Sequence, residues 1–166
     1  MKLTQKILFN KDECDSIISN EIENMINWNM NDRKYDSKTI YYNESTKWIF
    51  DKLKHFFEIE TDLKIIKIKQ EIHFHKFIEG NWFGKHNDNR DERLYAVGVL
   101  LNNNFEGGDF KFYNPNEYIL DREIGNAYIF DAKTEHEITE ILSGTRYSLL
   151  WFLQKEHIKI KPNTLI

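Results

Sequence analysis

A length of 166 residues suits a single domain with a substantial core, and a hydrophobic share of 40% supplies the material for one. Only two Pro and seven Gly occur, which excludes long disordered or collagen-like tracts. The formal net charge of −4 argues against nucleic acid as the main partner. The single cysteine, Cys14, excludes an internal disulfide and fits a reducing compartment. No stretch has the character of a signal peptide or a membrane span, so we expect a soluble, cytoplasmic protein.

Two helices are predicted at the start of the chain. Asn10 can cap the first helix while Glu13 reaches back to it, as in a capping box. Apolar residues then recur at helical spacing through about Trp28. The polar stretch 29–38 breaks this pattern, and a second helix is expected over about 44–58.

From residue 63 onward the pattern changes to that of strands, because β-branched and aromatic residues largely alternate with polar ones. The strand candidates are 63–77, 94–101, 109–113, 118–120, 127–131, 136–138 and 145–153. Clusters of Gly and Asn separate them. No second set of helices is available to cover a parallel sheet, so the pattern favours an antiparallel sandwich or jelly roll.

His86 and Asp88 form a His-x-Asp pair, and His136 follows fifty residues after the first histidine. Residues i and i+2 of an extended segment share a face, so both side chains of the pair can serve one site. Two histidines and one carboxylate hold non-haem Fe(II) on one face and leave the opposite positions open. Such a pair also arises readily by chance in a chain with six His, and its Asn- and Asp-rich surroundings suit an ordinary polar turn.

Arg146 leads into an otherwise apolar strand candidate. Burial of its guanidinium would be costly without an anion, and the planar guanidinium group suits a carboxylate. The alternative is an arginine at the end of a strand whose side chain reaches solvent. His73 and His75 form a second histidine pair, which we interpret as part of an ordinary strand face. Cys14 lies on the apolar stripe of the first helix, where a buried, inert thiol is the usual finding.

The order of these parts is more specific than any one of them. It runs Phe77, Gly80, His86, Asp88, Gly107-Gly108-Asp109, Gly125, His136 and Arg146. Over about residues 66–153 this order resembles the prolyl 4-hydroxylase-like branch of the Fe(II)/2-oxoglutarate-dependent dioxygenases. The resemblance implies an α+β, mainly β fold: a double-stranded β-helix (jelly roll) with N-terminal helices packed on one sheet. It implies one dioxygenase domain over 1–166, with a helical part at about 10–60 and a jelly-roll core at about 63–155.

The resemblance also assigns roles to individual residues. His86, Asp88 and His136 would bind Fe(II), and Arg146 would pair with the distal carboxylate of 2-oxoglutarate. The implied reaction uses O2 to convert 2-oxoglutarate to succinate and CO2 and hydroxylates a C–H bond, with ascorbate as a supporting reductant. Related halogenases replace the carboxylate ligand with a small residue, so the presence of Asp88 favours hydroxylation.

Two positions depart from the family pattern. Phe77 stands where the family usually has a tyrosine whose hydroxyl contacts 2-oxoglutarate, and Asp109 stands where glutamate is usual. The lost hydroxyl removes a hydrogen bond that is typically worth about 0.5–1.5 kcal/mol. His75 shares a strand face with Phe77, and Ser148 lies two residues beyond Arg146, so we expect one of the two to supply the donor.

The substrate is less constrained than the cofactors. Trp82, Phe83 and Asn87 lie beside the ligands and are candidate substrate contacts, although the two aromatic residues could equally pack the loop. The leading hypothesis is hydroxylation of a prolyl residue, a peptide or an amino-acid-like small molecule, with neither nucleic acid nor membrane as a partner. The alternatives are a nucleic-acid demethylase with the same chemistry, which the net charge disfavours, and a non-enzymatic jelly-roll module that binds a metal or small ligand. The sequence leaves the oligomeric state open.

Overall fold

The computed structural model describes residues 3–160. Its two α-helices are α1 (Lys11–Glu21) and α2 (Lys47–Thr61), and a 3-10 turn, η1 (Lys155–His157), lies near the end. The strands are β1 (Thr4–Ile7), β2 (Ile26–Met30), β3 (Arg33–Tyr41), β4 (Lys64–Ile65), β5 (Glu71–Phe77), β6 (Trp82–His86), β7 (Arg93–Leu100), β8 (Phe105–Gly107), β9 (Phe110–Phe112), β10 (Tyr118–Ile119), β11 (Asn126–Asp131), β12 (His136–Ile138), β13 (Ile141–Gly144), β14 (Arg146–Gln154) and β15 (Ile158–Lys159). Among these described residues, no helix is long and apolar enough to cross a membrane.

Helix α1 begins as the sequence predicts. The Asn10 side chain accepts a hydrogen bond from the Glu13 amide at 2.8 Å, and the Glu13 carboxylate accepts one from the Asn10 amide at 3.0 Å. These reciprocal bonds satisfy amide groups that the first helical turn cannot pair. The helix ends at Glu21, however, and does not continue to Trp28 as predicted.

The segment after α1 is a β-hairpin, which corrects the prediction of a helix through Trp28 followed by an irregular polar stretch. β2 pairs antiparallel with β3, with Ile26 opposite Ser37 and Met30 opposite Arg33. The apolar residues of β2 alternate with asparagines, as in a strand. All five residues of β2 are exposed, so this segment lacks the buried face that would hold it as a helix on the core.

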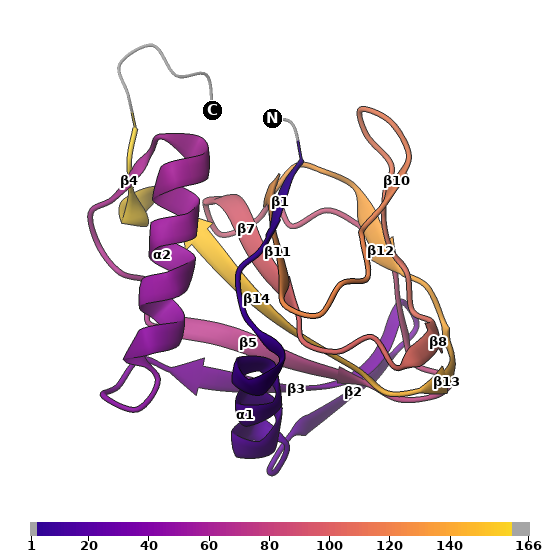
Figure 1. The fold of residues 1–166 in the computed structure, drawn as a ribbon. Helices are drawn as coiled ribbons and strands as arrows, with labels where there is room; N and C mark the ends of the chain where they lie inside the picture. Colours follow the sequence, from indigo (N-terminus) through magenta and orange to yellow (C-terminus); the bar gives the residue numbers. More distant parts are fainter. Residues whose placement is uncertain (1–2, 161–166) are drawn as a thin grey trace.

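Most strands belong to one curled antiparallel sheet. Its order is β1-β11-β7-β14-β5-β3-β6-β12-β9-β10, with β2 added beside β3. In Figure 1 the helices lie on one side of β14 and β5, while the strands from β12 to β10 curl round at the other side. This is the jelly roll with helices packed on one sheet that the sequence predicts.

The strand predictions succeed best in the second half of the chain. The observed β7, β9, β10, β11, β12 and β14 lie within two residues of the predicted ranges. The long strand predicted over 63–77 is instead divided into β4 and β5. Strands β1, β6, β8, β13 and β15 are not predicted by the sequence, and β8 lies within one of the Gly- and Asn-rich clusters that separate the predicted strands.

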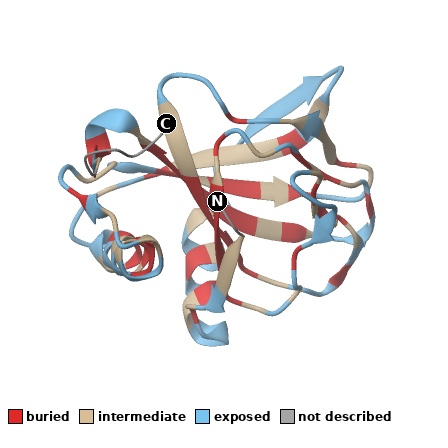
Figure 2. Cartoon of the chain, turned by 90° about the horizontal axis from the view of Figure 1, so that it is seen from above, coloured by how far each residue is buried: buried red, intermediate tan, exposed pale blue. Residues whose placement is uncertain are grey.

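The central strands separate two hydrophobic clusters. On the helix side, Phe74 of β5 and Trp151 of β14 pack with Phe50 and Leu53 of α2 and Ile17 of α1. The opposite face of the same strands contributes to a second cluster inside the curl. Figure 2 shows the strands through the middle of the molecule buried along much of their length. Because side chains alternate along a strand, one sheet supplies both a structural core and the lining of the jelly-roll interior.

Leu53 on α2 is fully buried in the cluster that holds this helix on the sheet. We expect Leu53→Ala to lower the free energy of unfolding by about 2–5 kcal/mol, because it removes buried apolar atoms and leaves a cavity. The matched control Ile59→Ala lies on the same helix but is 63% exposed, so it should change stability by less than about 0.5 kcal/mol. Urea unfolding followed by circular dichroism measures both, and equal losses would contradict this packing of α2.

Candidate active site

Cross-strand pairing brings the two predicted histidine ligands together. β6 and β12 are antiparallel neighbours, and His86 at the end of β6 lies directly opposite His136 at the start of β12. Asp88 follows β6, and its amide donates a hydrogen bond to the Ala132 carbonyl at 2.9 Å. Backbone pairing alone therefore closes two distant stretches of sequence into one site.

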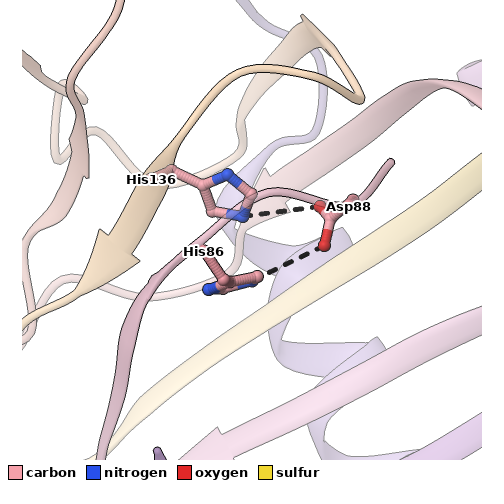
Figure 3. A group of neighbouring side chains, drawn as sticks. All are labelled: His86, Asp88 and His136. Atoms are coloured by element: carbon pink, nitrogen blue, oxygen red, sulfur yellow. Dashed lines mark ion pairs between the residues drawn. The ribbon is translucent and has the colours of Figure 1, made fainter. Parts of the chain in front are cut away.

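The three side chains converge, as Figure 3 shows. Nε2 of His86 lies 3.5 Å from one carboxylate oxygen of Asp88, and Nε2 of His136 lies 3.4 Å from the other. The candidate ligand atoms all lie within 4.8 Å of one another. In residues 3–160 this is the one group of three or more His, Cys, Asp or Glu side chains arranged to hold a metal ion.

The second nitrogen of each ring fixes its tautomer. Nδ1 of His86 lies 2.6 Å from the Gly84 carbonyl oxygen, and Nδ1 of His136 lies 2.9 Å from the Thr134 carbonyl oxygen. A carbonyl oxygen only accepts hydrogen bonds, so Nδ1 carries the proton in both neutral rings. The Nε2 lone pairs are then free and directed toward Asp88, as in histidines that ligate metals.

The protonation states also suit metal binding. Burial opposes the ionisation of Asp88, but the favourable interaction of the carboxylate with the rings of His86 and His136 outweighs it and lowers the pKa of this carboxyl group. Burial is the main reason that the pKa of His136 is lowered, which keeps that imidazole neutral near pH 7. A carboxylate and a neutral imidazole are the forms that bind metal ions.

Two buried side-chain atoms in the described part of the chain have no hydrogen-bond partner: Oδ2 of Asp88 and Nε of Arg146. Buried polar atoms without partners are rare in folded proteins, and a missing ligand is one reason for them. The unpartnered acceptor, Oδ2 of Asp88, lies in the His-Asp-His group, where a bound cation would be its partner. The unpartnered donor, Nε of Arg146, belongs to a buried guanidinium, for which a bound anion would be the partner. The residues therefore fit both Fe(II) and a dicarboxylate co-substrate.

Arg146 is buried, 1% exposed, at the start of β14, so the alternative of an arginine that reaches solvent is wrong. Its Nη1 donates a hydrogen bond to the Ser148 hydroxyl oxygen at 3.0 Å. The pairing of β14 with β5 places Phe77 opposite Arg146 and His75 opposite Ser148. Cross-strand partners share a face, so these four residues lie together inside the jelly roll. Burial lowers the pKa of Arg146, but a guanidinium keeps its charge at neutral pH.

The glycine pair before Asp109 makes room for this arrangement. Gly108 has φ +61°, and a Cβ there would lie 2.2 Å from Ile141 Cδ1 and 3.4 Å from Arg146 Cδ. A side chain at this position would therefore push into the residues around the guanidinium. Asp109 itself pairs with Arg122 at 2.7 Å.

A cavity of about 220 Å³ opens beside the three candidate ligands. His75 and Ser148 line it, whereas Arg146 lies behind Ser148 and Phe77 is fully buried against Tyr35, with ring centroids 4.9 Å apart. Burial lowers the pKa of His75 to about 3, so this ring is neutral. The structure thus brings both expected donors, His75 and Ser148, to the cavity.

The three predicted substrate contacts do not share one environment. Phe83 and Asn87 line the cavity, and the Phe83 ring stacks on His86 with 3.8 Å between ring centroids. Trp82 lies outside the cavity, and its ring packs closely beside Gly84. The Trp82 ring therefore packs within its own segment, and its contact with a substrate stays a prediction.

Tyr128 is a cavity-lining residue that the sequence did not single out. It lies on β11 directly opposite Gly98 on β7, and a Cβ at Gly98 would lie 2.2 Å from Tyr128 Cζ. Gly98 is therefore the residue that admits the phenol ring. Tyr128 is buried, and its hydroxyl interacts with the Arg146 guanidinium. A glycine inside a strand signals a close approach, but the sequence does not say which side chain approaches.

The sequence also failed to identify three arginines that line the cavity: Arg33, Arg90 and Arg93. Arg33 belongs to β3, together with the cavity-lining Tyr35. Arg33 and Tyr35 lie on the hairpin for which the sequence predicts a helix and a polar stretch, whereas Arg90 lies in the loop after Asp88 and Arg93 begins β7.

A model of the 2OG-Fe(II) oxygenase superfamily matches residues 72–154, which is half of the chain. A search of curated proteins gave no significant match. Among solved structures, the fold is similar to a prolyl-4-hydroxylase from Pseudomonas putida, with a TM-score of 0.74, 18% identity and 92% of each chain covered. It is also similar to a viral collagen prolyl hydroxylase from Paramecium Bursaria Chlorella virus-1, with a TM-score of 0.75, 18% identity and coverage of 92% of this chain and 95% of that one.

A third similar structure is a prolyl hydroxylase from Trichoplax adhaerens, solved with a hypoxia inducible factor peptide fragment. Its TM-score is 0.75 at 16% identity, over 93% of this chain and 84% of that one. At such identities the structural likeness establishes the fold alone. Because the family model spans half of the sequence and the fold recurs among these enzymes, the chain belongs to the 2OG-Fe(II) oxygenase superfamily, a family of dioxygenases.

Proposed function

We propose that the protein couples the oxidative decarboxylation of 2-oxoglutarate to succinate and CO2 with the hydroxylation of a C–H bond. His86, Asp88 and His136 hold Fe(II), which when bound supplies the O2 activation that this reaction needs. The observation that carries the proposal is the unpartnered Oδ2 of buried Asp88, which lies 3.4 Å from Nε2 of His136, while Oδ1 of the same carboxylate lies 3.5 Å from Nε2 of His86. A divalent cation at this point compensates a buried charge that would otherwise be costly.

The distal carboxylate of 2-oxoglutarate binds at Arg146 and Ser148. The Ser148 hydroxyl oxygen accepts the hydrogen bond from Arg146 Nη1, so its own proton is left to donate toward the cavity that it lines. The guanidinium adds a charge-assisted contact, which is stronger than one between neutral groups. His75, opposite Ser148 on β5, borders the same position as a neutral side chain.

Tyr128 supplies the phenol that Phe77 lacks. Burial raises the pKa of Tyr128, so its hydroxyl keeps its proton at neutral pH and can donate it. The hydroxyl lies beside the Arg146 guanidinium and lines the same cavity as Ser148. A phenol from β11 thus reaches the carboxylate position from a different strand than the usual tyrosine at position 77.

The substrate is a prolyl residue of a peptide or an amino-acid-like small molecule. Prolyl hydroxylases are prominent among the structures with a similar fold, and the Trichoplax enzyme was solved with a peptide. Phe83 and Asn87 line the cavity together with the ligand His86. They are therefore placed to contact a substrate that binds near the metal ligands.

Anaerobic titration of the protein with Fe(II) and 2-oxoglutarate should give a weak visible charge-transfer band. We expect His136→Ala to abolish the band, because it removes a metal ligand, and Arg146→Ala to raise the 2-oxoglutarate concentration needed for it by about tenfold or more. His55→Ala, an exposed histidine on α2, is the matched control and should leave the titration unchanged.

Failure of well-folded wild-type protein to give the band would contradict the metal and co-substrate site. Succinate release above background then tests catalysis, since a non-enzymatic jelly-roll module would bind without producing succinate.

Tyr128→Phe should weaken 2-oxoglutarate binding about three- to tenfold in the same anaerobic titration, because it removes one hydrogen-bond donor worth about 0.5–1.5 kcal/mol. Fe(II) affinity should not change, because Tyr128 is not a ligand. Tyr95→Phe removes a hydroxyl from the neighbouring strand β7 and serves as the control. Equal 2-oxoglutarate affinity in wild-type protein and Tyr128→Phe would show that Tyr128 does not replace the missing phenol.

A further inference from the structure

Arginine is distributed unevenly in this protein. The sequence contains five Arg against eighteen Lys, yet Arg33, Arg90 and Arg93 all line the cavity beside the metal ligands. Arg146 does not line the cavity, but its hydrogen bond links it to Ser148, which does. Among the described residues that line the cavity there is no lysine, and Asp88 is the sole carboxylate. A cavity that is lined by arginine in a lysine-rich chain indicates recognition of a planar anion, to which the guanidinium fork is matched.

Arg93 is the most informative of the three. Its guanidinium stacks on the Phe152 ring, with 3.7 Å between the guanidinium carbon and the ring centroid. The side chain is half-buried, and no carboxylate in the part of the chain that the structure describes forms an ion pair with it. Stacking orients the plane of the guanidinium and leaves its edge N–H groups available for an acceptor. Arg93 is thus a partly desolvated cation that is oriented by stacking and forms no ion pair with a carboxylate among residues 3–160.

The other two arginines are less available. Arg33 lies over the Phe83 ring at 4.4 Å and pairs with Asp32 at 2.9 Å. Arg90 is exposed, with Asp91 3.8 Å away. An exposed pair of this kind contributes little and is readily exchanged for another partner. Both arginines therefore add positive potential around Arg93, which remains the primary binding group.

The charges deeper in the site do not neutralise Arg93. In the proposed complex, the charges of Fe(II) and Arg146 are balanced by Asp88 and by the two carboxylates of 2-oxoglutarate. The positive charges of the arginines that line the cavity are then not balanced, and they are available to a second ligand. A second ligand with a negative group would remove this imbalance, whereas a neutral ligand would cover an unpaired guanidinium at a cost.

We propose that the substrate carries a carboxylate and that Arg93 binds it through a bidentate contact, with Arg33 and Arg90 as supporting charges. This inference rests on the proposed function, because it concerns the second ligand of the same cavity. The substrate class is therefore an amino acid with a free carboxylate or a peptide with an acidic residue beside the hydroxylated one. Phe83 carries the supporting Arg33 over its face and stacks on His86, so it lies between this charge and the metal position.

Anaerobic calorimetry on the protein loaded with Fe(II) and 2-oxoglutarate tests the inference with matched probes. The probes are the common amino acids, each as free acid and as carboxamide, and proline-containing hexapeptides that differ by Glu or Gln beside the proline. We expect acids to bind about tenfold or more tightly than their neutral partners. Arg93→Gln should abolish this preference, and Arg93→Lys should restore only part of it, because lysine keeps the charge without the fork. Lys85→Gln removes a charge from β6 outside the cavity and is the control.

The outcomes separate the two proposals. If wild-type protein gives no charge-transfer band with Fe(II) and 2-oxoglutarate, the proposed function fails. If the band forms but no acid binds more tightly than its amide, or if the preference survives in Arg93→Gln, the carboxylate inference is wrong and the proposed function stands. The band in Arg93→Gln should equal that of the wild type, which excludes an indirect effect through Asp88. Succinate release with the preferred acid, lost in Arg93→Gln, then separates substrates from ligands that merely bind.

Discussion

The ionised carboxylate of Asp88 is the group around which the site is organised. A buried carboxylate is costly unless positive charge or hydrogen-bond donors compensate it, and here both neighbouring imidazoles present lone pairs rather than protons. Each feature that holds this arrangement is a backbone feature: the pairing of His86 with His136, the Asp88 amide on Ala132, and the carbonyls that fix both rings. The fold therefore holds the three candidate ligands together through its backbone, ready for a cation.

The curled sheet both packs against the helices and lines the candidate site, because successive side chains of a strand point to opposite faces. Along β14, Leu149 and Trp151 belong to the cluster beneath the helices, while Arg146 and Ser148 face the interior. The same strand thus stabilises the molecule through one face and positions polar groups through the other. Packing by α1 and α2 on the first face supplies the rigidity that the buried guanidinium on the second face requires.

The sequence predicts much of the site because its chemistry depends on residue types in a fixed order. His86, Asp88 and His136 are recognisable together with the glycine pair and Arg146, and the structure places them as that order implies. The capping box of α1 is equally local and was predicted. Features that depend on pairing between distant strands could not be predicted from the sequence in the same way.

The β2–β3 hairpin illustrates why. Ile22, Met25 and Ile26 fit a helical period, while Ile26, Trp28 and Met30 fit a strand, so the local pattern is compatible with both. The pairing of β3 with β5 decides the outcome, and that pairing is not encoded in any short window. The fit of Tyr128 against Gly98 has the same character, because each residue is unremarkable without its partner on the neighbouring strand.

This hairpin contributes to the cavity lining but not to the group of metal ligands. Trp28, Arg33 and Tyr35 reach the cavity from a segment that contributes no metal ligand. The outer strand β2 is exposed along its whole length and pairs only with β3, so its side chains are free to vary without disturbing the sheet core. Changes in this hairpin would therefore alter the shape and charge of the cavity while leaving His86, Asp88 and His136 in place.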